Sequence, residues 1–176
     1  KFSSGYWSSF DPTNGYTAIA ASTAAQLPLH KISRSYFFET DMLFRLNTVR
    51  AVVVDVPMDA KYETEFSNLK ITQILGEFFA GHIRNFCKRI FYNYYLRGMS
   101  VASLELPLGL GLIGWGMGFG LYQWGKSLAM GMVTPAGTVM FSALPLILGV
   151  QLCLAFIAFD VAAEPTNSQR STGALP

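Results

Sequence analysis

Charged residues are scarce in this sequence of 176 residues. They make up 14% of it, whereas about a quarter of a typical soluble domain is charged. The scarcity is local, because charges are common up to Arg97 and then nearly vanish until Asp160. The net charge of +2 is too small to indicate a nucleic-acid partner, and we expect none. This pattern predicts a polar segment followed by an apolar one.

Cysteine is also scarce, and the first residues lack the usual signals of a chain start. Cys87 and Cys153 are too few to indicate a disulfide framework or a metal site, so we expect two buried free thiols. There is no initiator methionine, no charged n-region and no signal-peptide core. We therefore expect the sequence to begin inside a domain, as a fragment of a longer protein.

Two long uncharged runs follow the polar segment. Residues 106–124 and 138–159 contain no Asp, Glu, Lys or Arg, and about 20 helical residues cross the hydrocarbon core of a bilayer. The intervening residues hold a single Lys126 and a Pro135, which predicts a short turn. We expect residues 101–160 to form two antiparallel transmembrane helices of an integral membrane protein. Residues 161–176 are expected to be a disordered polar tail.

Basic residues indicate the orientation of these spans. Arg84, Lys88, Arg89 and Arg97 precede the first span, whereas the connecting turn carries only Lys126. Lys and Arg are enriched on the cytoplasmic flanks of transmembrane helices. We therefore expect the polar segment to be cytoplasmic.

Glycine is abundant in the first predicted span. Gly114/Gly118 and Gly116/Gly120 form two small-xxx-small pairs, a spacing that lets another helix approach closely. We reject a phosphate-binding loop, because no strand precedes this run and the run is uncharged and apolar. The spacing predicts close packing against the second span or against another subunit, as in a helix–helix oligomer, and does not distinguish the two.

Residues 71–100 are expected to form an amphipathic juxtamembrane helix. Its apolar stripe has helical spacing: Phe79, Ile83, Phe86, Ile90 and Tyr94. Basic residues fall largely off this stripe and aromatic residues gather near its end, as is typical of a helix at the membrane–water interface. The alternative is a helix that packs on a soluble domain and presents a basic face to water. Arg84, Lys88 and Arg89 are candidate contacts for a phosphate carried on a lipid, with plain attraction to anionic headgroups as the alternative.

The polar segment, residues 1–70, predicts helix followed by strand. Asp-Pro at residues 11–12 and the following Asn14-Gly15 mark a turn. The runs at 17–26 and 36–46 predict helices. The valine-rich run at 51–58, interrupted by Pro57, predicts a strand. This order indicates a mixed α/β sheet.

Four stretches of the polar segment carry a family resemblance: DPTNGYTA (residues 11–18), FFETDMLFRL (37–46), DVPM (55–58) and SNLK (67–70). In this order, followed by the helix hairpin, they resemble the C-terminal half of a membrane-anchored family-2 glycosyltransferase. The dolichyl-phosphate mannose synthase-like and polyprenyl-phosphate glycosyltransferase proteins are the most similar branch. The resemblance covers the chain up to the second span. It implies that residues 1–70 are the C-terminal part of an α/β GT-A catalytic domain.

The resemblance implies a catalytic carboxylate. When the acidic motif of the family is anchored on Arg45-Leu46, that carboxylate falls at Glu39, or at Asp41 as in the mannose synthase branch. Side chains two residues apart point about 200° apart on a helix, so only one of them faces the acceptor. An alcohol acceptor needs such a group as a base, whereas a lipid phosphate needs it to orient groups or to hold the metal. Acids in a first helical turn are also favoured by the helix dipole alone.

The resemblance implies further contacts as well. Ser67 and Lys70 fall in a loop close to the phosphates of the donor, and Asn14 and Gly15 fall in a turn on the acceptor side. The donor half of the family supplies a nucleotide pocket and an Asp-x-Asp that holds Mg²⁺ or Mn²⁺. This sequence contains no Asp-x-Asp. We therefore expect no metal and no nucleotide sugar on this chain alone.

The full-length parent is thus expected to transfer a sugar, with inversion, from a nucleotide-sugar donor to an acceptor such as a polyprenyl phosphate. The expected place is the cytoplasmic face of a bacterial inner membrane, in cell-envelope polysaccharide synthesis. The alternative is a non-catalytic membrane scaffold or assembly subunit that pairs through its glycine-rich helix.

Overall fold

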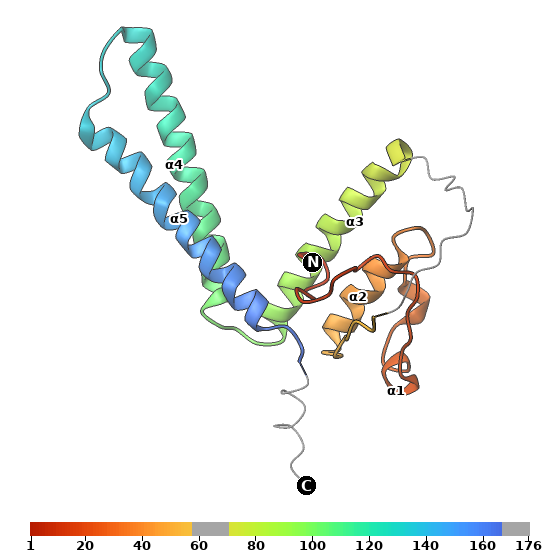
Figure 1. Cartoon of the computed structure of the whole chain (residues 1–176). Coiled ribbons are helices and arrows are strands. Elements are labelled where there is room, and N and C mark those ends of the chain that lie inside the picture. The colour runs from red at the N-terminus through yellow and green to blue at the C-terminus, as the bar shows by residue number, and fades with distance from the viewer. Residues whose placement is uncertain (58–70, 167–176) are drawn as a thin grey trace. The chain divides into compact units, whose positions relative to one another are not determined.

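The computed structural model describes residues 1–57 and 71–166, and all regular structure in these ranges is helical (Figure 1). The elements in chain order are α1 (Ala21–Ala24), the 3₁₀ turn η1 (Leu29–Lys31), α2 (Phe38–Thr48), α3 (Ile71–Phe91), the π-helical turn η2 (Tyr92–Leu96), α4 (Ala102–Met130) and α5 (Ala136–Ala162). The chain forms two compact units. The first unit is Lys1–Asn93 together with the residues that follow α5, and the second is Tyr94–Ala162.

The predicted α/β GT-A-type fold is wrong for the part of the chain that the structure describes, because that part contains no strand. The valine-rich run has no regular secondary structure over residues 51–57. A strand needs a neighbouring strand to pair its backbone groups, and none lies in the described ranges. Arg50, with a positive φ of 57°, turns the chain out of α2, and the Ala51 N–H donates to the Leu46 carbonyl. Valine content alone therefore did not produce a strand in these residues.

The helix predicted over residues 36–46 is observed as α2, whereas the run at 17–26 forms only the single turn α1. The difference lies in what each segment buries. The core of the first unit is built around α2: Tyr6, Leu27, Met42, Leu43 and Leu46. The alanine-rich run buries nothing within α1, and a short helix without tertiary packing is not stable in water. The Tyr6 hydroxyl, which donates to the Ala51 carbonyl at 2.6 Å, closes this core.

Helix α3 packs against α2 through Phe37. The Phe37 ring lies edge-on to the rings of Phe78 and His82, with centroids 5.6 and 5.1 Å away. A Cβ on Gly81 would lie 2.9 Å from the Phe37 ring, so a larger residue at this position would push the helices apart. The predicted apolar stripe of α3 is divided, because Ile90 is buried while Phe79 and Ile83 are exposed.

The prediction of two buried thiols is wrong for Cys87. This side chain is exposed on α3, because it lies four residues after the exposed Ile83 and so on the same side of the helix. Cys153 is partly buried in α5, where its Sγ would lie 2.8 Å from a Cβ on Gly109.

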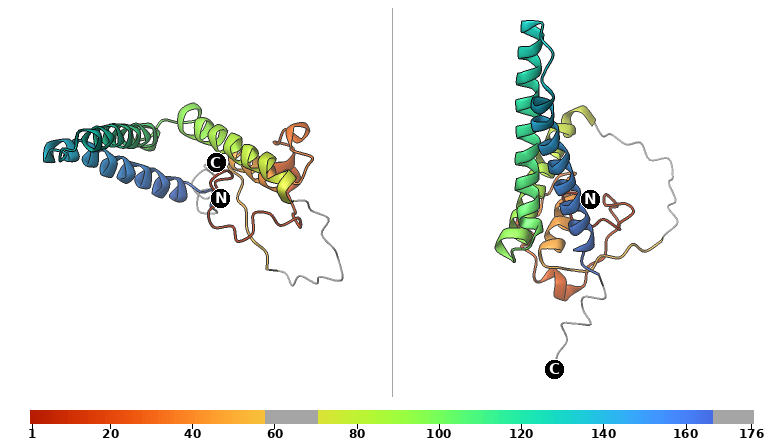
Figure 2. Two further views of the ribbon diagram at one scale, coloured as in Figure 1. Left: turned by 90° about the horizontal axis from the view of Figure 1, so that it is seen from above. Right: turned by 90° about the vertical axis from the view of Figure 1, so that its left-hand side faces the viewer.

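Helices α4 and α5 form an antiparallel hairpin and lie side by side in both views of Figure 2. Gly131 ends α4 in the left-handed conformation, with φ of 64°. Both helices are long and apolar enough to cross a membrane, and only 11% of the apolar window of each is buried. A core helix of a soluble protein would be mostly buried, so membrane association explains these helices better. The spans predicted at 106–124 and 138–159 lie within them.

One glycine face of α4 lies against α5. A Cβ on Gly116 would lie 2.7 Å from the Ser142 carbonyl oxygen, and one on Gly109 would lie 2.9 Å from the Gly149 carbonyl oxygen. The Ser142 hydroxyl donates to the Gly116 carbonyl at 2.7 Å. A Cβ on Gly114 or Gly118 would meet nothing within 4 Å in the described structure. The second span is therefore the partner of Gly116, whereas the Gly114/Gly118 pair is not used within the hairpin.

A polar cluster connects the two ends of the second unit. The Tyr94 hydroxyl donates to Asp160 Oδ1 at 2.6 Å, and the Ser103 hydroxyl donates to the Tyr94 carbonyl at 2.5 Å. The Tyr94 ring also lies 5.2 Å from the ring of Phe156. Buried polar groups are stable only when they are hydrogen-bonded, so this cluster satisfies the Asp160 carboxylate at the end of α5.

The glycine contact yields a paired prediction. Gly116→Ala places a methyl group against the Ser142 backbone, and we expect it to destabilise the α4–α5 hairpin by about 1–3 kcal/mol, the cost of overpacking. Gly118→Ala is the matched control, because it adds the same atoms in open space and improves helix propensity. The measurement is unfolding in detergent, followed by the fluorescence of Trp115 and Trp124. Equal stability of the two variants would contradict the observed packing.

Candidate functional site

The two candidate carboxylates lie in different environments, although both are in the first turn of α2. Asp41 is only 1% exposed. Its Oδ2 accepts hydrogen bonds from the Ser33 N–H at 2.9 Å and from Arg45 Nε at 3.1 Å, and its Oδ1 accepts one from Asn85 Nδ2 at 3.0 Å. These bonds link α2, α3 and the segment before α2. Asp41 therefore serves as a structural anchor, and its burial keeps its carboxylate away from an acceptor in solution or in lipid.

Glu39 is half-buried and faces the Asn14-Gly15 turn. Its Oε1 lies 3.9 Å from the position that a Cβ on Gly15 would take. The turn is held by its own side chains: Asp11 Oδ1 accepts from the Thr13 N–H, and Asn14 Oδ1 accepts from the Tyr16 N–H. The hydrogen bonds from Thr13 also lower the pKa of Asp11. The structure thus brings together Glu39 and the turn predicted on the acceptor side.

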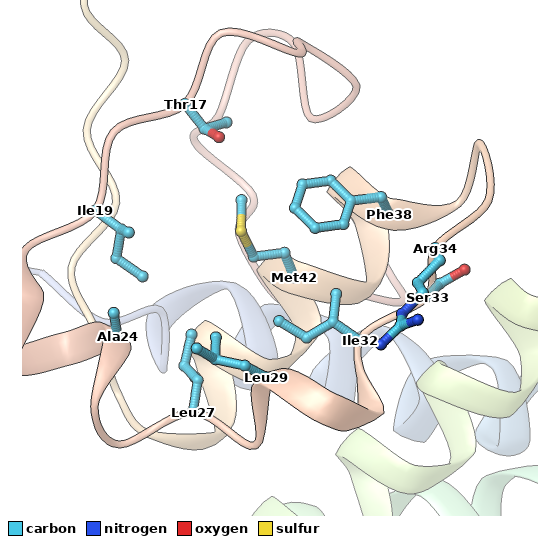
Figure 3. A pocket seen from close by; sticks show the side chains of 10 residues that line it. All are labelled: Thr17, Ile19, Ala24, Leu27, Leu29, Ile32, Ser33, Arg34, Phe38 and Met42. Atoms are coloured by element: carbon cyan, nitrogen blue, oxygen red, sulfur yellow. The ribbon is translucent and has the colours of Figure 1, made fainter.

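An apolar cavity of about 480 Å³ adjoins this pair of elements (Figure 3). Its lining comes from the segment after the turn, from η1 and from α2: Thr17, Ile19, Ala24, Leu27, Leu29, Ile32, Ser33, Arg34, Phe38 and Met42. The cavity shares elements with the carboxylate and the turn, since the lining residue Phe38 directly precedes Glu39 and the lining residue Thr17 follows Gly15 by two residues. Arg34 contributes the charged side chain of the lining. The arrangement can hold a hydrocarbon chain with an anionic group near the guanidinium.

Sequence reasoning missed Arg34 and the cavity. Arg34 lies in a polar loop between Ser33 and Ser35, where neither helical nor strand spacing marks it. The cavity is formed by residues spread from 17 to 42, and their proximity depends on how the loop folds back onto α2. The one available signal was the number of apolar residues in this loop.

The three basic candidates on α3 also differ. Arg84 and Lys88 are exposed. Arg89 is 1% exposed, and its Nε and Nη2 donate to the Phe2 carbonyl at 3.1 and 2.7 Å. Arg89 therefore holds the N-terminal segment in place. Ser67 and Lys70 lie outside the described residues.

The described residues contain no group of three or more His, Cys, Asp and Glu side chains that could hold a metal ion. Asp41, a buried carboxylate whose partner Ser33 lines the cavity, is already bonded to Arg45, Asn85 and Ser33. The residues described here therefore do not fit the Mg²⁺ or Mn²⁺ expected for the full-length parent.

No family model, curated protein or solved structure matches this chain. The glycosyltransferase resemblance therefore rests on the sequence motifs alone.

The environments of the two carboxylates predict that their removal destabilises the first unit by different amounts. Asp41→Ala removes the partner of Arg45 and Asn85, and we expect it to destabilise the first unit by about 3 kcal/mol, as for other broken buried pairs. Glu39→Ala, the matched control on the same helix, is expected to cost less than about 1 kcal/mol. Hydrogen exchange of the α2 amides measures both. Equal losses of protection would show that Asp41 does not anchor α2.

Proposed function

We propose that this chain belongs to a membrane-anchored inverting glycosyltransferase. It transfers a sugar from a nucleotide-sugar donor to a lipid-linked acceptor, with a polyprenyl phosphate as the preferred class. The observation that carries the proposal is the position of Glu39 at the acceptor-side turn, on the helix that also supplies Phe38 and Met42 to an apolar cavity lined by Arg34. The motif resemblance supplies the reaction type, and the geometry supports the choice of residues.

Glu39 is the functional carboxylate in this proposal. The resemblance left Glu39 and Asp41 as alternatives, and Asp41 is buried and bonded on both oxygens. For a hydroxyl acceptor, Glu39 takes the proton as the oxygen attacks the anomeric carbon and the nucleoside diphosphate leaves. For a phosphate acceptor, which is already ionised, Glu39 orients the attacking group.

Arg34 and the cavity provide the acceptor contacts. Apolar walls remove a hydrocarbon chain from water, which contributes about 25 cal/mol for each Å² of apolar surface buried. The planar guanidinium of Arg34 is well matched to the oxygens of a phosphate. The donor contacts, including Ser67, Lys70 and a divalent cation, are assigned to the remaining parts of the full-length protein.

The membrane helices support a lipid-linked rather than a soluble acceptor. Two helices long and apolar enough to cross a bilayer keep the protein where such lipids are found. The four basic residues before the first span favour a cytoplasmic polar segment, where nucleotide sugars are available. We place the protein in a bacterial inner membrane on the basis of the resemblance.

The test uses the full-length protein that contains this sequence, reconstituted in lipid and assayed with radiolabelled nucleotide sugars and a polyprenyl phosphate. Glu39→Gln is expected to lower kcat about 100-fold, the order of loss when a reacting group is misplaced, because Glu39 no longer orients the acceptor phosphate. Glu77→Gln, which removes an exposed glutamate on α3, is the matched control and keeps full activity. Transfer by Glu39→Gln at the wild-type rate would contradict the assignment, and no transfer by wild type with any donor would contradict the function.

A membrane scaffold is the second candidate, and one observation favours it. Gly111, Gly114 and Gly118 have no neighbour within 4 Å of their Cβ positions in the described structure, so α4 offers a second glycine face to another helix. A scaffold would show no sugar transfer, and Gly114→Leu would weaken its self-association or its association with a partner. A transferase would retain transfer in the same variant.

A further inference from the structure

Helix α3 carries an exposed apolar stripe that its own unit does not cover. Leu75, Phe79 and Ile83 are between 47% and 67% exposed, and Cys87, one turn further along the helix, is also exposed. These residues are multiples of four apart, and each step of four rotates by about 40°, so together they occupy one side of the helix. This stripe differs from the one predicted from the sequence, because Ile90 points into the protein.

The opposite side of α3 is fixed by the first unit. Asn85 bonds to Asp41, Arg89 bonds to the Phe2 carbonyl, and Gly81 lies against Phe37. The orientation of α3 within this unit is therefore determined. Its exposed stripe is a consequence of that orientation, since rotating the helix would break these buried contacts.

Two exposed cations lie along one edge of the stripe. Arg84 and Lys88 follow Ile83 and Cys87 directly, which puts both on one edge of the stripe. His82 adds little positive charge at neutral pH, because burial lowers its pKa. Glu77 is the acidic residue among the described side chains of α3. The face thus combines apolar side chains with a local excess of positive charge.

We propose that this face of α3 binds the surface of an anionic bilayer. The stripe enters the acyl region, and Arg84 and Lys88 contact the headgroup phosphates. The combination is that of an interfacial helix, whose affinity comes from apolar burial and from attraction to anionic lipid. A bilayer is the favoured partner because the same chain begins a membrane-length helix at Ala102, only a few residues after α3 ends at Phe91. The inference does not depend on sugar transfer.

The depth of the stripe can be measured in the intact chain. Phe79→Cys and Glu77→Cys, each in a Cys87→Ser/Cys153→Ser background, are labelled with an environment-sensitive fluorophore. The protein is reconstituted in vesicles of phosphatidylcholine, or of equal parts of phosphatidylcholine and phosphatidylglycerol. We expect the label at residue 79 to be quenched by nitroxide lipids and protected from iodide, and the label at residue 77 to show the reverse. The contrast is expected to increase with phosphatidylglycerol.

The charge contribution is tested with Arg84→Gln/Lys88→Gln in the Phe79→Cys protein. Each cation near an anionic surface is worth about fivefold in binding, so the docked fraction should fall in phosphatidylglycerol vesicles and change little in phosphatidylcholine. Quenching of residue 79 by iodide in both lipids would overturn the proposal. Protection from both quenchers would also overturn it, because protein would then cover the stripe. Lipid quenching that is independent of phosphatidylglycerol would overturn the role of the cations.

Discussion

The first unit depends on one buried carboxylate. Asp41 joins the segment before α2 through Ser33, α2 itself through Arg45, and α3 through Asn85. Burying an ionised carboxylate costs several kcal/mol unless its oxygens are paired. Separating any one of these three segments would remove a hydrogen bond that offsets this cost. The orientation of Glu39 and the orientation of α3 both follow from this constraint. In the proposed site Asp41 thus has a supporting, structural role.

Features encoded over short stretches of sequence were predicted well. The α4–α5 hairpin follows from two uncharged runs of membrane length, and α2 follows from apolar residues at helical spacing. The sheet prediction failed because a strand depends on a distant partner that residues 51–57 cannot specify by themselves. The single turn α1 shows the same limit for helices, since alanine propensity without buried side chains does not extend a helix.

The candidate site was only partly predictable. The motif order pointed to Glu39 and Asp41, but burial distinguishes them, and burial depends on α3 supplying Asn85 from 44 positions away in sequence. Arg34 and the cavity come from irregular backbone that has no period to detect. On α3, spacing grouped Tyr94 with the apolar stripe, whereas the helix changes to a π-turn at Tyr92 and Tyr94 instead bonds to Asp160.

The glycines of α4 have a consequence for how the hairpin enters a membrane. They allow its backbone to approach α5, but they also remove apolar side chains, and α4 is the less hydrophobic of the two helices. A segment with marginal hydrophobicity partitions poorly into lipid alone and gains from a neighbour that packs against it. We therefore expect α4 to be retained in the bilayer by pairwise insertion, in which α5 acts as its stabilising partner during biogenesis.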